Sequence, residues 1–317
     1  MKTLTVQVIN KRVEAREIVS FELALPDGSP LPAFTPGAHI DVHIDEGLVR
    51  QYSLCNDSGE RHRYRIAVLR TPDSRGGSIG MHDRITEGAL VRIGEPRNHF
   101  EMRSAGHVLL LAGGIGVTPL LAMAGALARK DQPFEMHYCA RTQAGMAFRD
   151  EIASSPFAHR VRFHADDGRP EQRFDLQGTL ASCPPGTELY VCGPAGFMAF
   201  VIDGARAAGW PESAIHKEFF GAAPADGAEQ GFDVELARSG KRVHVAADRS
   251  ITAALAEQGI EIPVSCQQGV CGTCITRVIA GIPEHRDLYF SDAEHAANDQ
   301  LTPCCSRART PLLVLDL

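Results

Sequence analysis

Residues 265–277 read SCQQGVCGTCITR, and this stretch places Cys266, Cys271 and Cys274 within nine positions. Thiolates held this close repel one another unless a cation neutralises them, so the loop is expected to bind iron or zinc. The two glycines between the cysteines can adopt positive φ and let backbone N–H groups point at sulfur. A zinc ribbon normally has two C-x2-C pairs, whereas only one is present here.

The spacing C-x4-C-x2-C followed by a distant fourth cysteine is that of plant-type [2Fe–2S] sites, and this region resembles a plant-type ferredoxin. The fourth ligand must then be Cys304 or Cys305. Cys304 follows Cys274 after 29 intervening residues, a separation usual in ferredoxins. We therefore expect Cys304 to be the ligand and Cys305 to be a packed neighbour. The segments EHRDLYFSDAE (284–294) and CSRARTPLLVLDL (305–317) carry the same resemblance.

The composition indicates a globular protein of two or three domains. The chain has 317 residues, of which 44% are hydrophobic and 22% charged, with a net charge of −7. This balance predicts neither nucleic-acid binding nor attraction to an anionic membrane. The N-terminal sequence MKTLTVQVIN reads as a strand rather than a signal peptide, and nine cysteines are an odd number, so we expect a reducing, cytoplasmic setting. Residues 108–128 are long and apolar enough to span a bilayer, but glycines and a proline divide them into a strand, a turn and a helix.

The chain changes character along its length, and three domains are predicted. Residues 1–104 contain alternating short strands and turns, typical of an antiparallel β-barrel or sandwich. Residues 105–224 alternate apolar strands with helices, typical of a parallel α/β sheet. Residues 225–231 have no large apolar side chain and are interpreted as a linker. Residues 232–317 begin with a hairpin and a short helix, and their likeness to ferredoxins implies an α+β, β-grasp domain.

Two glycine-rich stretches are candidate nucleotide-binding turns. Residues 74–82, SRGGSIGMH, are expected to open a helix and cradle a phosphate. Residues 113–119, GGIGVTP, follow an apolar strand and precede a helix, with Thr118 as a possible cap and Pro119 in the first helical turn. Each stretch alone is equally consistent with an ordinary loop.

Two further stretches would place side chains beside such turns. Residues 50–54, RQYSL, offer an arginine for a phosphate, a tyrosine that can stack on a planar ring and a serine hydroxyl. Residues 192–194, CGP, end a strand of the predicted parallel sheet, where ligands usually bind. The 13 histidines are assigned no catalytic role.

The order of these motifs resembles the ferredoxin–NADP⁺ reductase superfamily, and the three-domain order resembles the family of phthalate dioxygenase reductase and vanillate O-demethylase reductase. The resemblance implies that Ser53 lies near N5 of a flavin, Cys192 beside the nicotinamide, and Phe220 over the other face of the flavin. It assigns flavin binding to Arg50, Gln51, Tyr52, Ser53, Ala67, Val68, Leu69, Gly76, Gly77 and Ser78. It assigns nicotinamide nucleotide binding to Gly113, Gly114, Gly116, Thr118, Pro119, Cys192, Gly193 and Pro194, and iron binding to Cys266, Cys271, Cys274 and Cys304.

The implied function is an NADH-dependent oxidoreductase that passes electrons through FMN and a [2Fe–2S] cluster to a Rieske-type aromatic oxygenase or O-demethylase. FAD and NADPH stay open as alternatives, because no motif excludes an adenosine pocket or reads a 2′-phosphate. The partner is expected to bind transiently to a monomeric reductase. A di-iron or cytochrome oxygenase as acceptor, or a free-standing reductase, is a second reading. A non-enzymatic zinc or redox-sensing protein is a third, but it leaves the motifs at 50–54, 113–119 and 192–194 unexplained.

Overall fold

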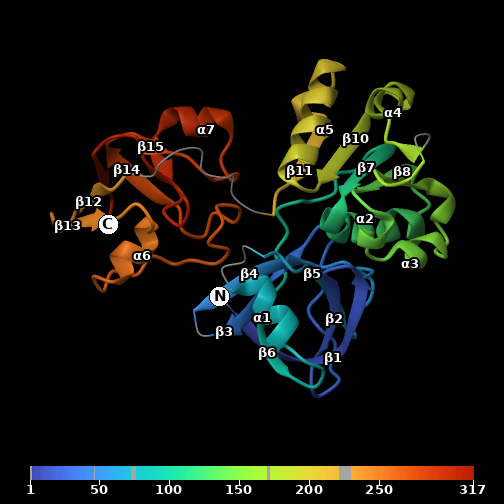
Figure 1. Ribbon diagram of the computed structural model, residues 1–317, viewed down its shortest axis with the longest axis horizontal. Coiled ribbons are helices and arrows are strands. Elements are labelled where there is room, and N and C mark those ends of the chain that lie inside the picture. The colour runs from blue at the N-terminus through green and yellow to red at the C-terminus, as the bar shows by residue number, and fades with distance from the viewer. Residues whose placement is uncertain (1, 46, 73–75, 170–171, 221–229) are drawn as a thin grey trace. The chain divides into compact units, whose positions relative to one another are not determined.

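The structure is a computed structural model that describes residues 2–45, 47–72, 76–169, 172–220 and 230–317. Contacts within the chain divide it into two compact units, residues 1–218 and residues 219–317. The first unit contains an antiparallel and a parallel sheet, and the second contains a smaller mixed sheet (Figure 1). The predicted antiparallel, parallel and ferredoxin-like parts are thus confirmed in that order. Most of the predicted linker lies outside the described residues, and the division into three domains stays a prediction.

The antiparallel sheet has the strand order β4-β3-β6-β1-β2-β5. The two outer strands, β4 and β5, are joined by hydrogen bonds between the residues just after β4 and Arg65 of β5. The amide of Cys55 donates to the carbonyl of Arg65, and the amide of Arg65 donates to Asn56 Oδ1, both at 2.8 Å. These bonds close the sheet into a barrel, as predicted. The elements are β1 (Thr3–Ala15), β2 (Ile18–Ala24), β3 (His39–Asp45), β4 (Leu48–Ser53), β5 (Tyr64–Leu69), α1 (Gly77–Arg84) and β6 (Leu90–Gly94).

The helix α1 packs on the apolar core of the barrel. Met81 of α1 is 1% exposed and belongs to the same apolar cluster as Phe21, Ile40 and Ile66 of the strands. The helix therefore covers the barrel with one apolar turn. The first residues of α1 therefore lie next to β4 and β5, and both strands contact the helix.

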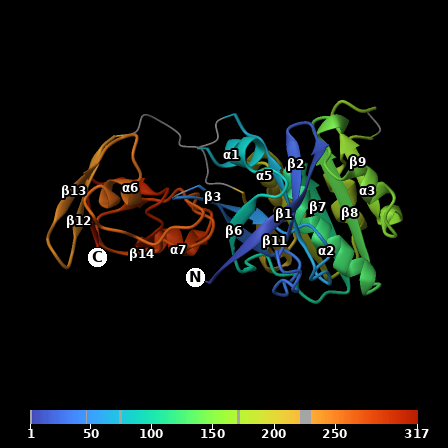
Figure 2. The same cartoon turned by 90° about the horizontal axis from the view of Figure 1, so that it is seen from below.

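The parallel sheet has the order β11-β10-β7-β8-β9, so β7 and β10 lie side by side within it. The strands are β7 (His107–Gly113), β8 (Phe134–Ala140), β9 (Val161–Ala165), β10 (Thr187–Cys192) and β11 (Ile215–Glu218). The helices are α2 (Val117–Arg129), α3 (Arg149–Ala153), α4 (Leu176–Ser182) and α5 (Ala195–Ala207). Figure 2 shows α2 running along the β7 and β8 region of this sheet.

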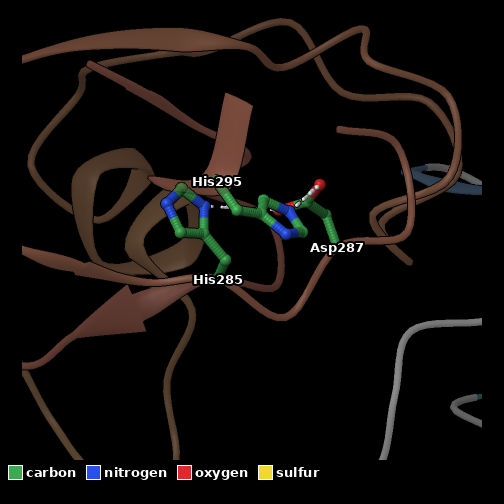
Figure 3. Close-up of side chains that lie close together, drawn as sticks. All are labelled: His285, Asp287 and His295. Atoms are coloured by element: carbon green, nitrogen blue, oxygen red, sulfur yellow. Dashed lines mark hydrogen bonds and ion pairs between the residues drawn. The ribbon is translucent and has the colours of Figure 1, made fainter. Parts of the chain in front are cut away.

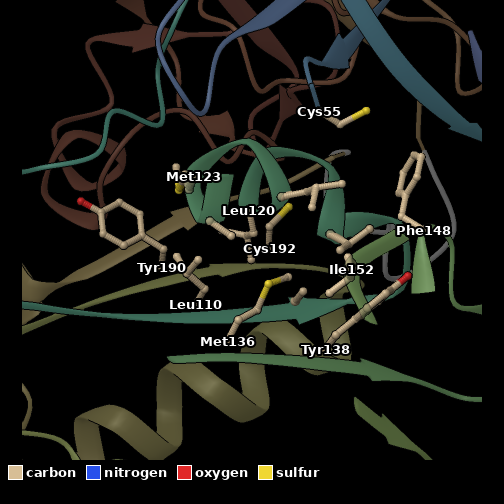
Figure 4. Packing of buried hydrophobic residues seen from close by; sticks show 14 of the residues in the cluster. Cys55, Leu110, Leu120, Met123, Met136, Tyr138, Phe148, Ile152, Tyr190 and Cys192 are labelled. Carbon is tan, nitrogen blue, oxygen red and sulfur yellow. The ribbon is translucent and has the colours of Figure 1, made fainter. Parts of the chain in front are cut away.

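Both faces of the parallel sheet are buried, which accounts for its uninterrupted apolar strands. Leu110 and Met136 project toward Leu120 and Met123 of α2 (Figure 4). The side chain of Leu109, the preceding residue of β7, points to the opposite face of the sheet and is also fully buried. The apolar stretch 108–128 is therefore a strand and a separate 13-residue helix. Among the described residues, no helix is long and apolar enough to cross a membrane.

The second unit contains the five-stranded sheet β13-β12-β18-β14-β16 and the two-stranded pair β15-β17. The predicted hairpin is present with Gly240 at φ 66°, and Gly259 at φ 73° follows the predicted helix. β12 pairs with β18 in parallel, and the other neighbouring strands of the five-stranded sheet pair antiparallel. The elements are β12 (Phe232–Leu236), β13 (Arg242–Val245), α6 (Ile251–Ala256), β14 (Thr276–Ala280), β15 (Pro283–Glu284), α7 (Asp292–Ala297), β16 (Gln300–Leu301), β17 (Arg307–Ala308) and β18 (Leu312–Leu315).

Candidate functional site

Arg50 lies beside the first turn of α1. Its side chain is buried, and a Cβ atom added at Gly77 would lie 2.7 Å from both Cγ and Nε of Arg50. Gly76, just before the helix, has φ 82°. Because these residues are glycines, the arginine can cross the helix start at close range. A guanidinium group next to helical N–H groups is a combination that suits a phosphate.

The rest of the predicted flavin segment is also in place. Ser53 and Val68 are buried on the neighbouring strands β4 and β5, while Tyr52 is half-buried. Burial raises the pKa of Tyr52, so its ring carries a neutral hydroxyl. Two of the predicted residues use their side chains elsewhere: Gln51 Nε2 donates to Asp41 Oδ1 at 3.0 Å, and Ser78 Oγ accepts from the amide of Thr71 at 3.1 Å. At Gln51 and Ser78 we therefore expect the backbone, rather than the side chain, to contact a ligand.

Backbone alone lines this part of β5 as well. Ala67 is 5% exposed, and its methyl group packs in the apolar cluster shared with the parallel sheet. The carbonyl of Val68 contacts His82 Nε2 at 2.9 Å, which ties β5 to α1. Leu69 is half-buried at the end of the strand.

The predicted nucleotide loop is packed backbone against backbone. A Cβ atom at Gly116 would lie 2.2 Å from the carbonyl oxygen of Cys192, and one at Gly193 would lie 3.0 Å from Cα of Gly113. The loop after β7 therefore lies directly on the end of β10, and neither Gly116 nor Gly193 can be replaced without displacing backbone. Gly114, between Gly113 and Gly116 in the chain, has φ 53°.

Two helices begin at this edge of the sheet. α2 starts after Gly116, and α5 starts after Pro194, which has an extended conformation. Paired helix starts at the carboxyl ends of parallel strands suit a pyrophosphate. Pro119 lies in the first turn of α2, as predicted. The prediction that Thr118 caps α2 is wrong, because the 3-10 turn at 114–116 runs directly into the helix, and Thr118 Oγ1 instead donates to the carbonyl of Ile115 at 3.0 Å.

Glu218 joins Ser53 and Cys192 in a group that the sequence analysis did not find. It ends β11 directly beside Cys192 of β10, and its carboxyl group is hydrogen-bonded to Ser53. Burial raises the pKa of Glu218 to about 8, and the Ser53 hydrogen bond partly opposes the shift. Among the described residues, Glu218 Oε2 is enclosed without a hydrogen-bond partner. In the sequence, Glu218 is a single glutamate two residues before Phe220, and nothing in its spacing marks it as part of a site.

Cys192 and Phe220 differ in their accessibility. Cys192 is fully buried, and its pKa is raised by burial and by the charge of Glu218, so it is a neutral thiol. Phe220 follows β11 and is 38% exposed, and it belongs to the second compact unit. Its placement over the flavin stays a prediction.

The four predicted iron ligands converge in the second unit. Cys266, Cys271, Cys274 and Cys304 are all less than 10% exposed. The thiol of Cys304 contacts those of Cys266 and Cys274. Hydrogen bonds from the thiols of Cys271 and Cys304 lower the pKa of Cys266. Four buried sulfur donors without an oxygen or nitrogen ligand among them fit an iron–sulfur cluster.

The cysteine loop has the glycine geometry that the sequence predicted. Gly269 has φ 70° and Gly272 has φ 69°, and the amide of Gln268 donates to Cys266 Sγ at 3.3 Å. Cys305 is half-buried, and its sulfur lies 3.2 Å from Thr302 Oγ1. A Cβ atom at Gly269 would lie 2.4 Å from that sulfur. Cys305 therefore packs behind the loop, which favours Cys304 as the fourth ligand.

Comparison with known proteins agrees with this arrangement. Residues 234–309 match the 2Fe-2S iron-sulfur cluster binding domain, and residues 96–215 match the N-terminal domain of dimethylamine monooxygenase subunit DmmA-like proteins. The chain is 50% identical to a vanillate O-demethylase oxidoreductase of Pseudomonas putida, over 98% of each chain.

Two solved structures are similar over almost the whole chain. Phthalate dioxygenase reductase, described as a modular structure for electron transfer from pyridine nucleotides to [2Fe-2S], matches with a TM-score of 0.82 at 40% identity, over 99% of this chain and 98% of that one. An intact type IV self-sufficient cytochrome P450 monooxygenase matches with a TM-score of 0.79 at 36% identity, over 99% of this chain and 41% of that one.

The placement of Cys304 predicts that Cys304→Ser removes the cluster while NADH still reduces the flavin. Cys305→Ser is the matched control and should keep the cluster, because its sulfur faces Thr302. Iron content and the visible absorbance of both purified variants, with stopped-flow flavin reduction, measure this. Loss of iron from Cys305→Ser with retention by Cys304→Ser would reverse the ligand assignment.

The position of Arg50 predicts that Arg50→Ala weakens flavin retention by roughly 10- to 100-fold, the usual worth of a charge-assisted hydrogen bond. Arg92→Ala, on the exposed side of β6 in the same barrel, is the control and should retain the flavin. The flavin content after extended dialysis measures the difference. Equal retention by both variants would contradict a phosphate site at the start of α1.

Proposed function

We propose that this chain, which belongs to the family of vanillate O-demethylase oxidoreductase and phthalate dioxygenase reductase, delivers electrons one at a time to a Rieske-type oxygenase component. The chain is an NADH-dependent oxidoreductase that passes electrons through a flavin and a [2Fe–2S] cluster to an oxygenase system. We propose FMN as the flavin, on the likeness to phthalate dioxygenase reductase.

The chemistry explains why the three sites share one chain. NADH gives up two electrons as a hydride, an iron–sulfur cluster accepts one electron at a time, and a bound flavin can do both. The residues of this chain are then needed mainly for positioning. The glycines at 113, 116 and 193 let the loop after β7 pack onto the end of β10, which brings the backbone proposed to bind the nucleotide to this edge of the sheet, and Arg50 with the start of α1 holds the flavin phosphate.

The group of Ser53, Cys192 and Glu218 lies where the two halves of the first unit meet. Cys192 presents a neutral, buried surface at the end of β10, where the nicotinamide ring is expected. Ser53 holds a hydroxyl beside the flavin position, and its orientation is set by the hydrogen bond to Glu218. Glu218 is uncharged at pH 7 because its raised pKa lies above that value. The site is thus free of fixed negative charge when hydride arrives.

The single observation that carries the choice of acceptor is the four-cysteine cluster site. Plant-type clusters have potentials near about −400 mV, whereas Rieske centres lie at roughly −150 to +300 mV, so electrons would flow downhill by at least about 250 mV. At about 59 mV per decade for one electron, this gap corresponds to roughly four powers of ten in equilibrium constant. The likeness to a self-sufficient cytochrome P450 favours a haem protein as the second candidate acceptor.

The encounter with the oxygenase is transient, and the reductase acts as a monomer, because one chain supplies all three cofactor sites. None of the nine cysteines, all of which lie in the described residues, forms a disulfide, which fits the proposed location in a reducing cytoplasm.

Reconstitution tests the acceptor directly. The purified holoenzyme, NADH and a Rieske O-demethylase or aromatic dioxygenase should together turn over the aromatic substrate, with product measured by chromatography. The same reductase is assayed in parallel with a cytochrome P450. Product with the P450 and none with any Rieske enzyme, although ferricyanide reduction is intact, would overturn the Rieske assignment.

The raised pKa of Glu218 predicts a pH dependence of flavin reduction. The group is neutral below about pH 8 and becomes an anion above it. Since an anion repels the negative charge that the arriving hydride brings, the wild-type rate constant should fall by roughly tenfold between pH 7 and pH 9. Glu218→Gln should have a flat profile when measured by anaerobic stopped-flow.

Glu212→Gln is the matched control. Its carboxyl group hydrogen-bonds to Arg206, which lowers the pKa of Glu212 to about 2, so it stays ionised throughout this range. The control should follow the wild-type profile. A Glu218→Gln profile that still falls near pH 8 would assign the titration to another group.

A further inference from the structure

Two histidines and an aspartate form a compact group in the second unit (Figure 3). His285 and Asp287 follow β15, and His295 lies in α7. His295 Nε2 lies 3.1 Å from Asp287 Oδ2, and His285 Nδ1 lies 3.7 Å from Asp287 Oδ1. One nitrogen or oxygen atom from each residue lies within 4.8 Å of the other two. None of these residues belongs to the cysteine site or to the nucleotide site.

The second nitrogen of His285 is already held. Its Nε2 lies 3.3 Å from Asn298 Oδ1, which can only accept, so the proton of the neutral ring is on Nε2. The lone pair is then on Nδ1, which faces Asp287. Among the described residues, Nδ1 is buried without a hydrogen-bond partner, and the side chain of His285 is only 10% exposed. A histidine that donates one N–H to a carbonyl and aims the other nitrogen inward is the arrangement of a metal ligand.

Asp287 presents a carboxylate oxygen to the same point. Its side chain is fully buried. Oδ2 accepts from the amides of Tyr289 at 3.2 Å and Phe290 at 3.0 Å, which fixes the orientation of the group. Within the described residues, Oδ1 accepts one long hydrogen bond, from Ser306 Oγ at 3.4 Å, besides its contact with His285. The oxygen nearest to His285 therefore keeps lone-pair capacity.

His295 is positioned from the other side by α7. The helix begins with a capping box, in which Ser291 and Glu294 bond each other's backbone N–H groups. The ring of His295 stacks on that of His285, with centroids 4.4 Å apart. Its side chain is 26% exposed, so the group is reached from solvent past this ring.

We propose that His285, Asp287 and His295 form a second metal site, separate from the iron–sulfur cluster, for a divalent ion such as Zn²⁺. Zinc–ligand bonds of about 2.0–2.2 Å in a tetrahedron separate the ligand atoms by roughly 3.3–3.6 Å. His295 Nε2 lies 3.1 Å from Oδ2 of Asp287 and His285 Nδ1 lies 3.7 Å from Oδ1, so each nitrogen is close to this separation from one of the two carboxylate oxygens. Two imidazoles and a carboxylate are donors that zinc shares with cobalt, nickel and copper, and the fourth position is left to water.

The site is attached to the cysteine loop. The amide of Leu288 donates to the carbonyl of Gly269 at 3.0 Å, and a Cβ atom at Gly269 would lie 2.9 Å from Cα and Cβ of Asp287. A dication bound at Asp287 would brace this loop and add positive charge beside the cluster. Positive charge stabilises the reduced cluster, so zinc is expected to raise the reduction potential of the cluster.

The test uses the full-length holoenzyme, treated with a chelator until zinc is removed and with its iron content verified. Zinc chloride is titrated against a chromogenic zinc indicator, and one equivalent per chain is expected to bind. X-ray absorption at the zinc edge should show only nitrogen and oxygen ligands, at about 2.0–2.2 Å. No stoichiometric zinc, or sulfur in the zinc shell, would overturn the proposal.

Variants assign the ligands. His285→Gln and His295→Gln should each weaken zinc binding more than tenfold, and Asn298→Ala should weaken it by about tenfold through the outer shell. His244→Gln is the matched control, because His244 is an exposed histidine that pairs with Asp233 in the same unit. The visible absorbance of the cluster verifies folding of each variant. The zinc-dependent rise in cluster potential should disappear in His295→Gln, and a double His285→Gln/His295→Gln variant with wild-type zinc affinity would overturn the proposal.

Discussion

The loop after β7 lies directly on the carbonyl group at the end of β10, and only hydrogen fits between them at residue 116. Parallel pairing of β7 with β10 brings the two strand ends to one edge of the sheet, and glycine makes the contact possible. The start of α2 and the burial of Cys192 both follow from this contact. The next strand, β11, then places Glu218 beside Cys192. The proposed nucleotide site is thus a consequence of backbone packing.

The cysteine loop uses the same principle at a smaller scale. Positive φ at Gly269 and Gly272 turns the chain tightly enough to bring cysteines from one segment toward Cys304. At Gly269 the missing side chain also makes room for Cys305 and Asp287. The loop is therefore packed on both sides, with sulfur ligands on one side and the histidine–aspartate group behind it.

The features that the sequence predicted correctly each depend on a short segment of the chain. Three cysteines within nine residues, a hairpin around Gly240 and a glycine-rich turn before α1 each depend on local spacing alone. The failures have a different origin. The capping of α2 depends on the 3-10 turn that precedes it, and no residue type at 118 reveals where that turn ends.

Two groups assembled from distant segments were missed in part or in full: the resemblance named Ser53 and Cys192 but not Glu218, and nothing marked His285 and His295. Three strands of two different sheets contribute Ser53, Cys192 and Glu218. A single glutamate in a charged segment does not indicate that its side chain will contact residues of the other strands. His285 and His295 read as ordinary surface residues until α7 folds one ring onto the other. Long-range contacts of this kind are set by topology, which residue spacing does not encode.

The enclosed thiol at the end of β10 has a chemical consequence for an enzyme that works in air. Reduced flavins pass electrons to oxygen and generate peroxide, so a flavin bound at the proposed site would form peroxide near this sulfur. Peroxide attacks thiolates, whereas Cys192 is held protonated and without solvent access. Burial thus protects this thiol from oxidation.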